Sequence, residues 1–262
     1  MTEQPRARER IAGQSAMTEV VATTPRSTGP VQRLFGADPL PPEQRAVFRG
    51  AEFADVVGQQ LDTLGQRWDV LHDVPLVSGS LSHLVIGPAG VFAVRSVDYG
   101  RAEISVVGGS IVVDGDAAED LALIAAQAQE VAERLEQGLH APVRVRPLLI
   151  VWQPRKLTVV DAVPVRVVAS PRLLPYLQRA GSALSGDRVA AVSDVADRPG
   201  TWAEPAAVDT ADPALLRAAF ARVRAQVRSA RRRRAAWIAA CVVVGYTAAW
   251  AAAAWFAAQM ML

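Results

Sequence analysis

The feature that most constrains this chain is a run of 24 residues without a charge, from Ala235 to Ala258. As an α-helix the run is about 36 Å long, since each residue adds roughly 1.5 Å, and the hydrocarbon core of a bilayer is ~30 Å thick. Twelve of the 24 residues are alanine, so the alternative is an alanine-rich helix buried in a soluble core. Such a helix normally carries a polar face, which only Thr247 and the Tyr246 hydroxyl could supply. The run therefore predicts a transmembrane helix at residues 235–258.

The charges before this helix predict its orientation. Four consecutive arginines, Arg231, Arg232, Arg233 and Arg234, directly precede the apolar run. Positive flanks stay on the cytoplasmic side and contact lipid headgroups. Residues 1–30 contain no apolar segment of the kind that opens a secretory signal. We therefore expect a single-pass membrane protein with a cytoplasmic N-terminal domain, in a topology that resembles a tail anchor.

The overall charge of the chain conceals an asymmetry between its two parts. Eight arginines lie between Arg217 and Arg234 with no acid among them, so removing them from the net charge of +2 leaves −6 for the remainder. An acidic globular part argues against broad binding of a phosphate backbone. Nucleic acid stays open as a partner of the arginine run, but its position beside the membrane favours lipid.

Two further features bear on partners and compartment. The single cysteine, Cys241, lies in the apolar run and excludes both a disulfide framework within the chain and a cysteine-based zinc site. Small residues recur at every fourth position of the same run, which permits close pairing with a second copy or with another membrane protein. They are Gly245, Ala249, Ala253 and Ala257.

The part of the chain before the arginines predicts one α/β domain between two less regular segments. Residues 1–44 are polar and without a sustained period, which predicts a disordered arm. Apolar spacing predicts helices at 46–64, 117–137 and 171–179, and a basic juxtamembrane helix at 213–234 that continues into the membrane. Residues 181–212 are interpreted as a linker with loop and weak helix. Extended runs predict strands at 68–71, 81–86, 91–94, 102–107, 111–113, 143–152, 156–160 and 163–168, with a turn near 73–75.

The order of these elements predicts a mixed sheet with helices packed against it, an α/β or α+β fold. The domain is expected at residues 45–180, and over roughly 45–178 it resembles the nuclease-related (NERD) family. The resemblance is carried by Gly50-Ala51-Glu52, the stretch from Val57 to Trp68, Val70-Leu71-His72-Asp73-Val74-Pro75, Gln127-Ala128 and, most specifically, Ser82-His83-Leu84-Val85-Ile86-Gly87-Pro88-Ala89-Gly90-Val91-Phe92. It implies a restriction-endonuclease-like core.

That resemblance also implies a metal site, which this chain lacks in part. The family pattern places one carboxylate on each of two neighbouring strands, and a lysine two residues after the second, around Mg²⁺. Here Ser82, Arg95 and Val97 occupy those positions, and only Glu52 on the first helix remains. A guanidinium in place of a carboxylate repels a divalent cation. The expected protein is a pseudoenzyme without a metal or other cofactor, which binds or scaffolds.

Several residues keep other interpretations open. A rearranged, Mg²⁺-dependent nuclease site could use Glu52, Asp73, Asp98 and Lys156, the sole lysine. Against this, Glu52 reads as an exposed first-turn acid favoured by the helix dipole, and the two aspartates as turn residues. His83 could line a site or be a buried strand histidine with a hydrogen-bond partner.

Two final hypotheses concern anions and the anchor. Arg95 and Arg101 could bind a phosphate in the former metal cleft, or lie exposed at strand edges. In a third hypothesis, the transmembrane helix and its arginines carry the function of the protein, and the domain is a passive member of a membrane complex.

Overall fold

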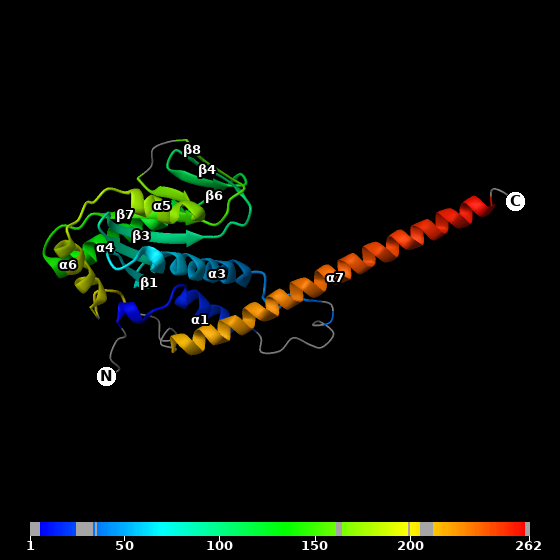
Figure 1. The fold of residues 1–262 in the computed structure, drawn as a ribbon, viewed down its shortest axis with the longest axis horizontal. Coiled ribbons are helices and arrows are strands. Elements are labelled where there is room, and N and C mark those ends of the chain that lie inside the picture. Colours follow the sequence, from blue (N-terminus) through cyan, green and yellow to red (C-terminus); the bar gives the residue numbers. More distant parts are fainter. Residues whose placement is uncertain are drawn as a thin grey trace.

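The described part of the molecule is a mixed α/β domain with two sheets, from which one long C-terminal helix extends (Figure 1). The computed structural model describes residues 6–24, 34, 36–160, 164–198, 200–204 and 212–259, with side chains of the last helix up to 253. The helices are α1 Gln14–Thr23, α3 Gln44–Leu61, α4 Asp120–Leu139, α5 Leu173–Arg179, α6 Gly186–Asp197 and α7 Pro213–Gln259; short 3-10 helices span Ala7–Glu9, Asp62–Leu64 and Ser170–Arg172.

The main sheet has five strands in the order β1-β2-β3-β7-β9. The first three strands are antiparallel, whereas β7 and β9 add in parallel after crossovers. A second sheet has the order β6-β5-β4-β8, so the single sheet expected from the sequence is divided in two. The strands are β1 Asp69–Leu76, β2 Gly79–Gly87, β3 Gly90–Val97, β4 Glu103–Val107, β5 Ser110–Val113, β6 Asp116–Ala118, β7 Val145–Val151, β8 Lys156–Val159 and β9 Arg166–Ala169.

Helices cover both faces of the main sheet. Leu121, Ile124 and Leu135 of α4 pack on one face, together with residues of α6. Phe53 of α3 and Leu177 of α5 pack on the other. The expected arrangement of mixed sheet and flanking helices is confirmed. Its physical reason is that strands buried on both faces need apolar cover on each side.

The turn between β2 and β3 depends on a close approach of an aromatic ring. A Cβ atom built on Gly87 would lie 2.2 Å from the Trp68 ring, so a larger residue there would displace the indole. Gly90 closes the same hairpin with φ of 128°, a conformation that other residues adopt only under strain. The Gly-Pro-Ala-Gly signal at this place therefore produces the predicted turn.

The prediction of a disordered arm is wrong for residues 6–24. Met17 and Val20 of α1 are buried in a third apolar cluster, which also contains Phe48 of α3 and Phe220 of α7. The sequence pattern of α1 is weak because its ten residues gain their stability from this tertiary packing rather than from helical propensity. Residues 36–44 of the expected arm are described as well, with Leu40 buried in the same cluster, whereas residues 1–5, 25–33 and 35 lie outside the described residues.

The expected linker at 181–212 also needs correction. Its middle part forms α6, which places Val192 and Val195 in the core beside α4, and the following Trp202 is buried as well. The Trp202 indole N–H donates to the carbonyl of Ala196 at 2.7 Å. Residues 186–202, apart from the undescribed 199, therefore belong to the domain.

The turn expected near 73–75 is absent, because β1 continues through it. Asp73 has φ of 51° and is 3 % exposed. Its carboxylate pairs with the guanidinium of Arg10 and accepts hydrogen bonds from Ser80 Oγ at 2.8 Å and from Ser15 Oγ at 2.7 Å. The carboxylate of Asp73 thus joins the segment around α1 to β2 at a strand residue with a left-handed backbone conformation.

The basic segment 213–234 and the apolar segment after it form one continuous helix, as expected. The 47 residues of α7 extend over about 70 Å at roughly 1.5 Å per residue. The first half packs on α1 and α3, and the second half leaves the domain (Figure 1).

Packing of α7 on the domain depends on Phe220, which is 2 % exposed with its ring centroid 5.4 Å from that of Phe48. We expect Phe220→Ala to lower the free energy of unfolding by about 3–5 kcal/mol, because it leaves a cavity. Urea unfolding of the full chain in detergent micelles, followed by far-UV circular dichroism, measures the loss. The matched control Leu215→Ala, at a side chain 69 % exposed, should cost under about 0.5 kcal/mol. Equal losses would contradict the docking.

Candidate functional site

The resemblance assigns two carboxylates and one lysine to positions 82, 95 and 97, which lie on β2 and β3. Each of the three residues found there has a structural role. Ser82 Oγ accepts a hydrogen bond from the backbone N–H of Ser96 at 3.2 Å. Val97 packs against the apolar core on the α4 side of the sheet. Neither side chain offers the anionic oxygen that a divalent cation requires.

Arg95 forms an ion pair where the second carboxylate was expected. Its Nε lies 2.8 Å from Oδ1 of Asp120, in the first turn of α4, and both side chains are at least three-quarters buried. The Tyr99 hydroxyl donates to the same carboxylate. Burial and this hydrogen bond raise the pKa of Tyr99 well above its ordinary value. Arg95 therefore connects β3 to the start of α4, and the anion that it binds is the carboxylate of Asp120 in the same protein. Arg101 lies exposed in the loop before β4.

His83 is the inner member of a chain of three polar side chains. Asp62 Oδ1 lies 3.1 Å from His72 Nε2, and His72 Nδ1 lies 2.9 Å from His83 Nδ1. With His72 donating to the carboxylate from Nε2, its Nδ1 accepts and the Nδ1–H of His83 donates. His83 Nε2 is then a buried acceptor without a hydrogen-bond partner among the described residues. Burial, and then the neighbouring His72, lower the pKa of His83 well below its ordinary value.

These contacts agree with the interpretation of His83 as a buried strand histidine with a hydrogen-bond partner. The three linked side chains connect the segment after α3 to β1 and β2. Because Nε2 faces no solvent, His83 contacts no reagent from outside, and its neutral form is the one the fold accepts.

Glu52 is in contact with a cation of the long C-terminal helix α7. Glu52 Oε1 lies 2.9 Å from Arg224 Nε, and Asp55 Oδ2 lies 3.5 Å from Arg224 Nη2. Glu52 occupies the middle of α3 and is half-buried, so its interpretation as an exposed first-turn acid is wrong. The reason is tertiary: α7 lies over this face of α3 and brings Arg224 to both carboxylates.

A small pocket of about 210 Å³ borders this ion pair. Glu52 and Asp98 both line it, as the rearranged-site hypothesis requires, but Arg49, Arg224 and Arg228 line it too. Asp98 Oδ1 accepts from the N–H of Gly100 at 2.7 Å, so it is the turn residue that the sequence indicated. Three guanidinium groups beside two carboxylates make the pocket a poor site for a divalent cation.

The other two members of the hypothetical rearranged site lie elsewhere. Asp73 is buried against Arg10, and Lys156 Nζ pairs with Glu103 Oε1 at 2.9 Å on the second sheet. Across the described ranges, no three side chains of histidine, cysteine, aspartate or glutamate converge as a metal site would need.

The second half of α7 is a candidate membrane segment. By length and composition, one described helix could cross a bilayer, and every described side chain from 231 to 253 is exposed to solvent. Arg231, Arg232, Arg233 and Arg234 end the part of α7 that packs on the domain, with Ala230 the last buried residue before them. Beyond them the Trp237 Nε1–H donates to the carbonyl of Leu34 at 2.9 Å, and the described apolar side chains up to 253 are exposed.

Sequence reasoning missed a larger pocket of about 780 Å³ between the ends of β8 and β9 and helix α5. Five cationic side chains line it: Arg155, Lys156, Arg166, Arg172 and Arg179. They are spread over 25 residues of sequence, and only the crossover from β8 to α5 brings them together. The spacing of Arg172 and Arg179, seven apart and hence on one helical face, was the one available signal.

Comparison of the chain with protein families, with curated proteins and with solved structures finds no match. The fold itself defines the class of molecule: a mixed α/β domain with a long apolar C-terminal helix.

The lowered pKa of His83 predicts a pH dependence of stability. The unfolded chain binds a proton near pH 6.5 while the folded protein resists it, so stability is full above this pH and falls as the pH drops below it. We expect the loss to approach about 1.4 kcal/mol per pH unit relative to His83→Asn. Urea unfolding at several pH values between 7.5 and 5 measures it.

The control for this experiment is His140→Asn. His140 is exposed and ends α4 with φ of 52°, a conformation that asparagine tolerates. That variant should follow the wild-type pH profile. A wild-type profile parallel to that of His83→Asn would show that His83 is protonated as easily in the folded state as in the unfolded one.

Proposed function

We propose that this chain is a single-pass membrane protein whose cytoplasmic α/β domain is a NERD-like, catalytically inactive module that binds or scaffolds. The observation that carries the proposal is the continuity of α7. One helix packs on the domain through Phe220 and Val227, passes the four arginines, and continues as an exposed apolar segment.

Exposure of that apolar segment to water is costly, which supports a membrane as its environment. Its side chains include Ile238, Val242 and Val244, each more than half exposed. Burial of apolar area is favourable by roughly 25 cal/mol per Å². Arginines at one end of such a segment favour the cytoplasmic side for the domain that precedes them.

Inactivity of the former nuclease site is supported by what its positions now hold. Ser82 is a hydrogen-bond acceptor for the backbone, Arg95 pairs with Asp120, and Val97 belongs to the core. The surviving Glu52 is engaged by Arg224. Recruiting Glu52 to a metal would require breaking a half-buried ion pair that joins the domain to its anchor.

The contact between Glu52 and Arg224 supports the scaffolding proposal, because it joins the domain to α7. A helix that is fastened to the domain by apolar packing and by this ion pair fixes how the domain is presented at the membrane surface. A partner would then meet the domain at a constant height and orientation. The membrane lipids are the partners best supported by the charge pattern, and a membrane protein or a second copy of the chain would bind along α7.

Cys241 provides a direct test of the membrane segment, because it is the chain's only cysteine and lies in the exposed apolar half of α7. We expect a membrane-impermeant maleimide to leave Cys241 unlabelled in inside-out membrane vesicles, and to label it after solubilisation in SDS, because the bilayer excludes the reagent. The matched control is Ala225→Cys in a Cys241→Ala background, at an exposed position of the docked half, which should be labelled in the same vesicles.

The same pair of proteins reports orientation. In intact cells the Ala225→Cys control should stay unlabelled, since the domain side of the membrane faces the cytoplasm. Rapid labelling of Cys241 in sealed vesicles would refute the anchor, whereas labelling of the control in intact cells would refute only the orientation.

A nuclease assay tests the inactive site. We expect the full chain in detergent micelles, with Mg²⁺ or Mn²⁺, to produce no more cleavage of single- or double-stranded DNA or RNA than Glu52→Ala, because no set of anionic ligands is in place. Metal-dependent cleavage that is lost in Glu52→Ala would favour the alternative function, a nuclease with a rearranged site around Glu52 and Asp98.

A further inference from the structure

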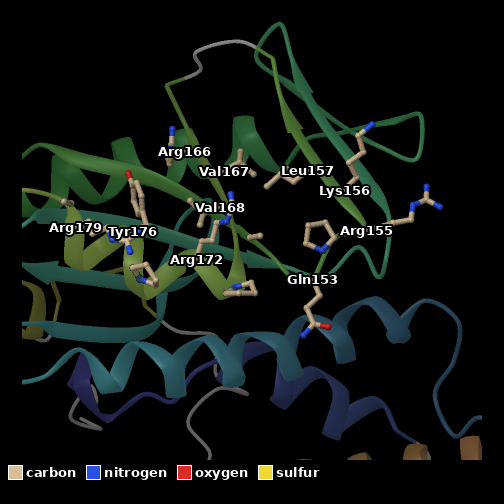
Figure 2. Close-up of a pocket in the computed structure, with 15 residues that line it drawn as sticks. Gln153, Arg155, Lys156, Leu157, Arg166, Val167, Val168, Arg172, Tyr176 and Arg179 are labelled. Atoms are coloured by element: carbon tan, nitrogen blue, oxygen red, sulfur yellow. The ribbon is translucent and has the colours of Figure 1, made fainter.

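The pocket beside α5 is strongly cationic, in a domain whose overall charge is negative. Figure 2 shows its lining, with Tyr176 on α5, Arg172 in the 3-10 helix directly before it, Arg166 and Val167 on β9, and Lys156 and Arg155 at the far rim. Five of the fifteen lining residues are basic and none is acidic. Outside the arginines of α7 the chain carries a net −6. The positive charge is thus gathered at one concave place.

The five cations divide into two groups by their partners. Lys156 and Arg155 lie at 2.9 and 3.5 Å from the carboxylate of Glu103, which offsets part of their charge. Arg166, Arg172 and Arg179 form no ion pair with an acid among the described residues, which exclude 161–163 of the neighbouring loop. These three guanidinium groups are therefore the part of the pocket that is available for an external anion.

Local structure explains why the three arginines share one site. Arg172 ends the 3-10 helix that leads into α5, and Tyr176 and Arg179 follow it at spacings of four and three, so the three residues lie on one helical face. Arg166 on β9 lies over Tyr176, with its guanidinium carbon 5.6 Å from the centre of the ring. Stacking on an aromatic ring leaves the edge of a guanidinium, and its N–H donors, directed outward. Pro171 and Pro175 restrict the backbone beneath.

We propose that this pocket binds a small ligand that carries two or more phosphate groups. A guanidinium group can donate two parallel hydrogen bonds to two oxygens of one phosphate. The three positive charges of these arginines exceed the single negative charge of one carboxylate, so a ligand with several charges matches them better. The volume of about 780 Å³ lies within the range of small-molecule sites. The ligand is either a soluble polyphosphate compound or the phosphorylated headgroup of a lipid, since the two present the same chemistry to the arginines.

The test uses the full chain in nanodiscs of neutral phosphatidylcholine, titrated with inorganic tripolyphosphate by calorimetry. We expect saturable binding that weakens as salt is raised. Arg172→Glu/Arg179→Glu should weaken binding at least about tenfold, since each charge-assisted pair contributes on that order. The matched control Arg144→Glu, at an exposed arginine before β7 that does not line the pocket, should stay within about twofold of wild type, because it contributes no donor to the site.

A second arm distinguishes the source of the phosphates. Vesicles that contain a phosphoinositide with two headgroup phosphates are compared with phosphatidylcholine vesicles, and the difference between wild type and Arg172→Glu/Arg179→Glu isolates the pocket from the arginines at 231–234. Loss of vesicle binding in the variant assigns a lipid headgroup; loss of tripolyphosphate binding alone assigns a soluble ligand.

Three results would overturn the proposal. They are the absence of tripolyphosphate and headgroup binding at millimolar concentration, an equal effect of Arg144→Glu, and variant-sensitive binding of oligonucleotides only, which would make the pocket a nucleic-acid surface. An unchanged thermal unfolding midpoint in each variant confirms that the substitutions act on binding and not on folding.

Discussion

The packing of the first half of α7 against α1 and α3 is the interaction on which the arrangement of this protein depends. Phe220 stacks near Phe48, and Leu216, Val223 and Val227 complete an apolar seam that also buries Met17 and Val20 of α1. This seam orders an N-terminal segment that has little helical signal of its own. It also joins the apolar half of α7 rigidly to the domain, because the helix has no break between the two halves.

Ion pairs between arginines and acids of distant segments are the second feature that organises the domain. Arg95 of β3 pairs with Asp120 of α4, and Arg224 of α7 pairs with Glu52 of α3. In both places a guanidinium group satisfies an acid and joins two elements of the fold. The pocket at α5 differs, because three of its arginines have no acid to satisfy within the described residues.

Most elements of the domain could be predicted from local patterns, and the failures share one cause. The alternation and turn signals around 81–97 and the apolar period of α4 predicted the hairpin and the helix correctly. By contrast, α1, α6 and the left-handed backbone conformation at Asp73 depend on distant partners: α7 for the first, α4 for the second and Arg10 for the third. Likewise the residues at positions 82, 95 and 97 could be identified from sequence, but their partners could not.

The sequence by itself determined the long apolar segment, its arginine flank, the strand and helix periods, and the presence of serine, arginine and valine at positions 82, 95 and 97. These properties depend only on residues that are close together in the sequence, so composition and spacing are enough to predict them. Only the tertiary structure decided that the sheet divides in two, that Arg224 covers Glu52, that His83 is buried in contact with His72, and that arginines from β9 and α5 form one pocket. Each of these needs two segments far apart in the chain to meet, and that meeting is set by which apolar faces pack together, which no local pattern specifies.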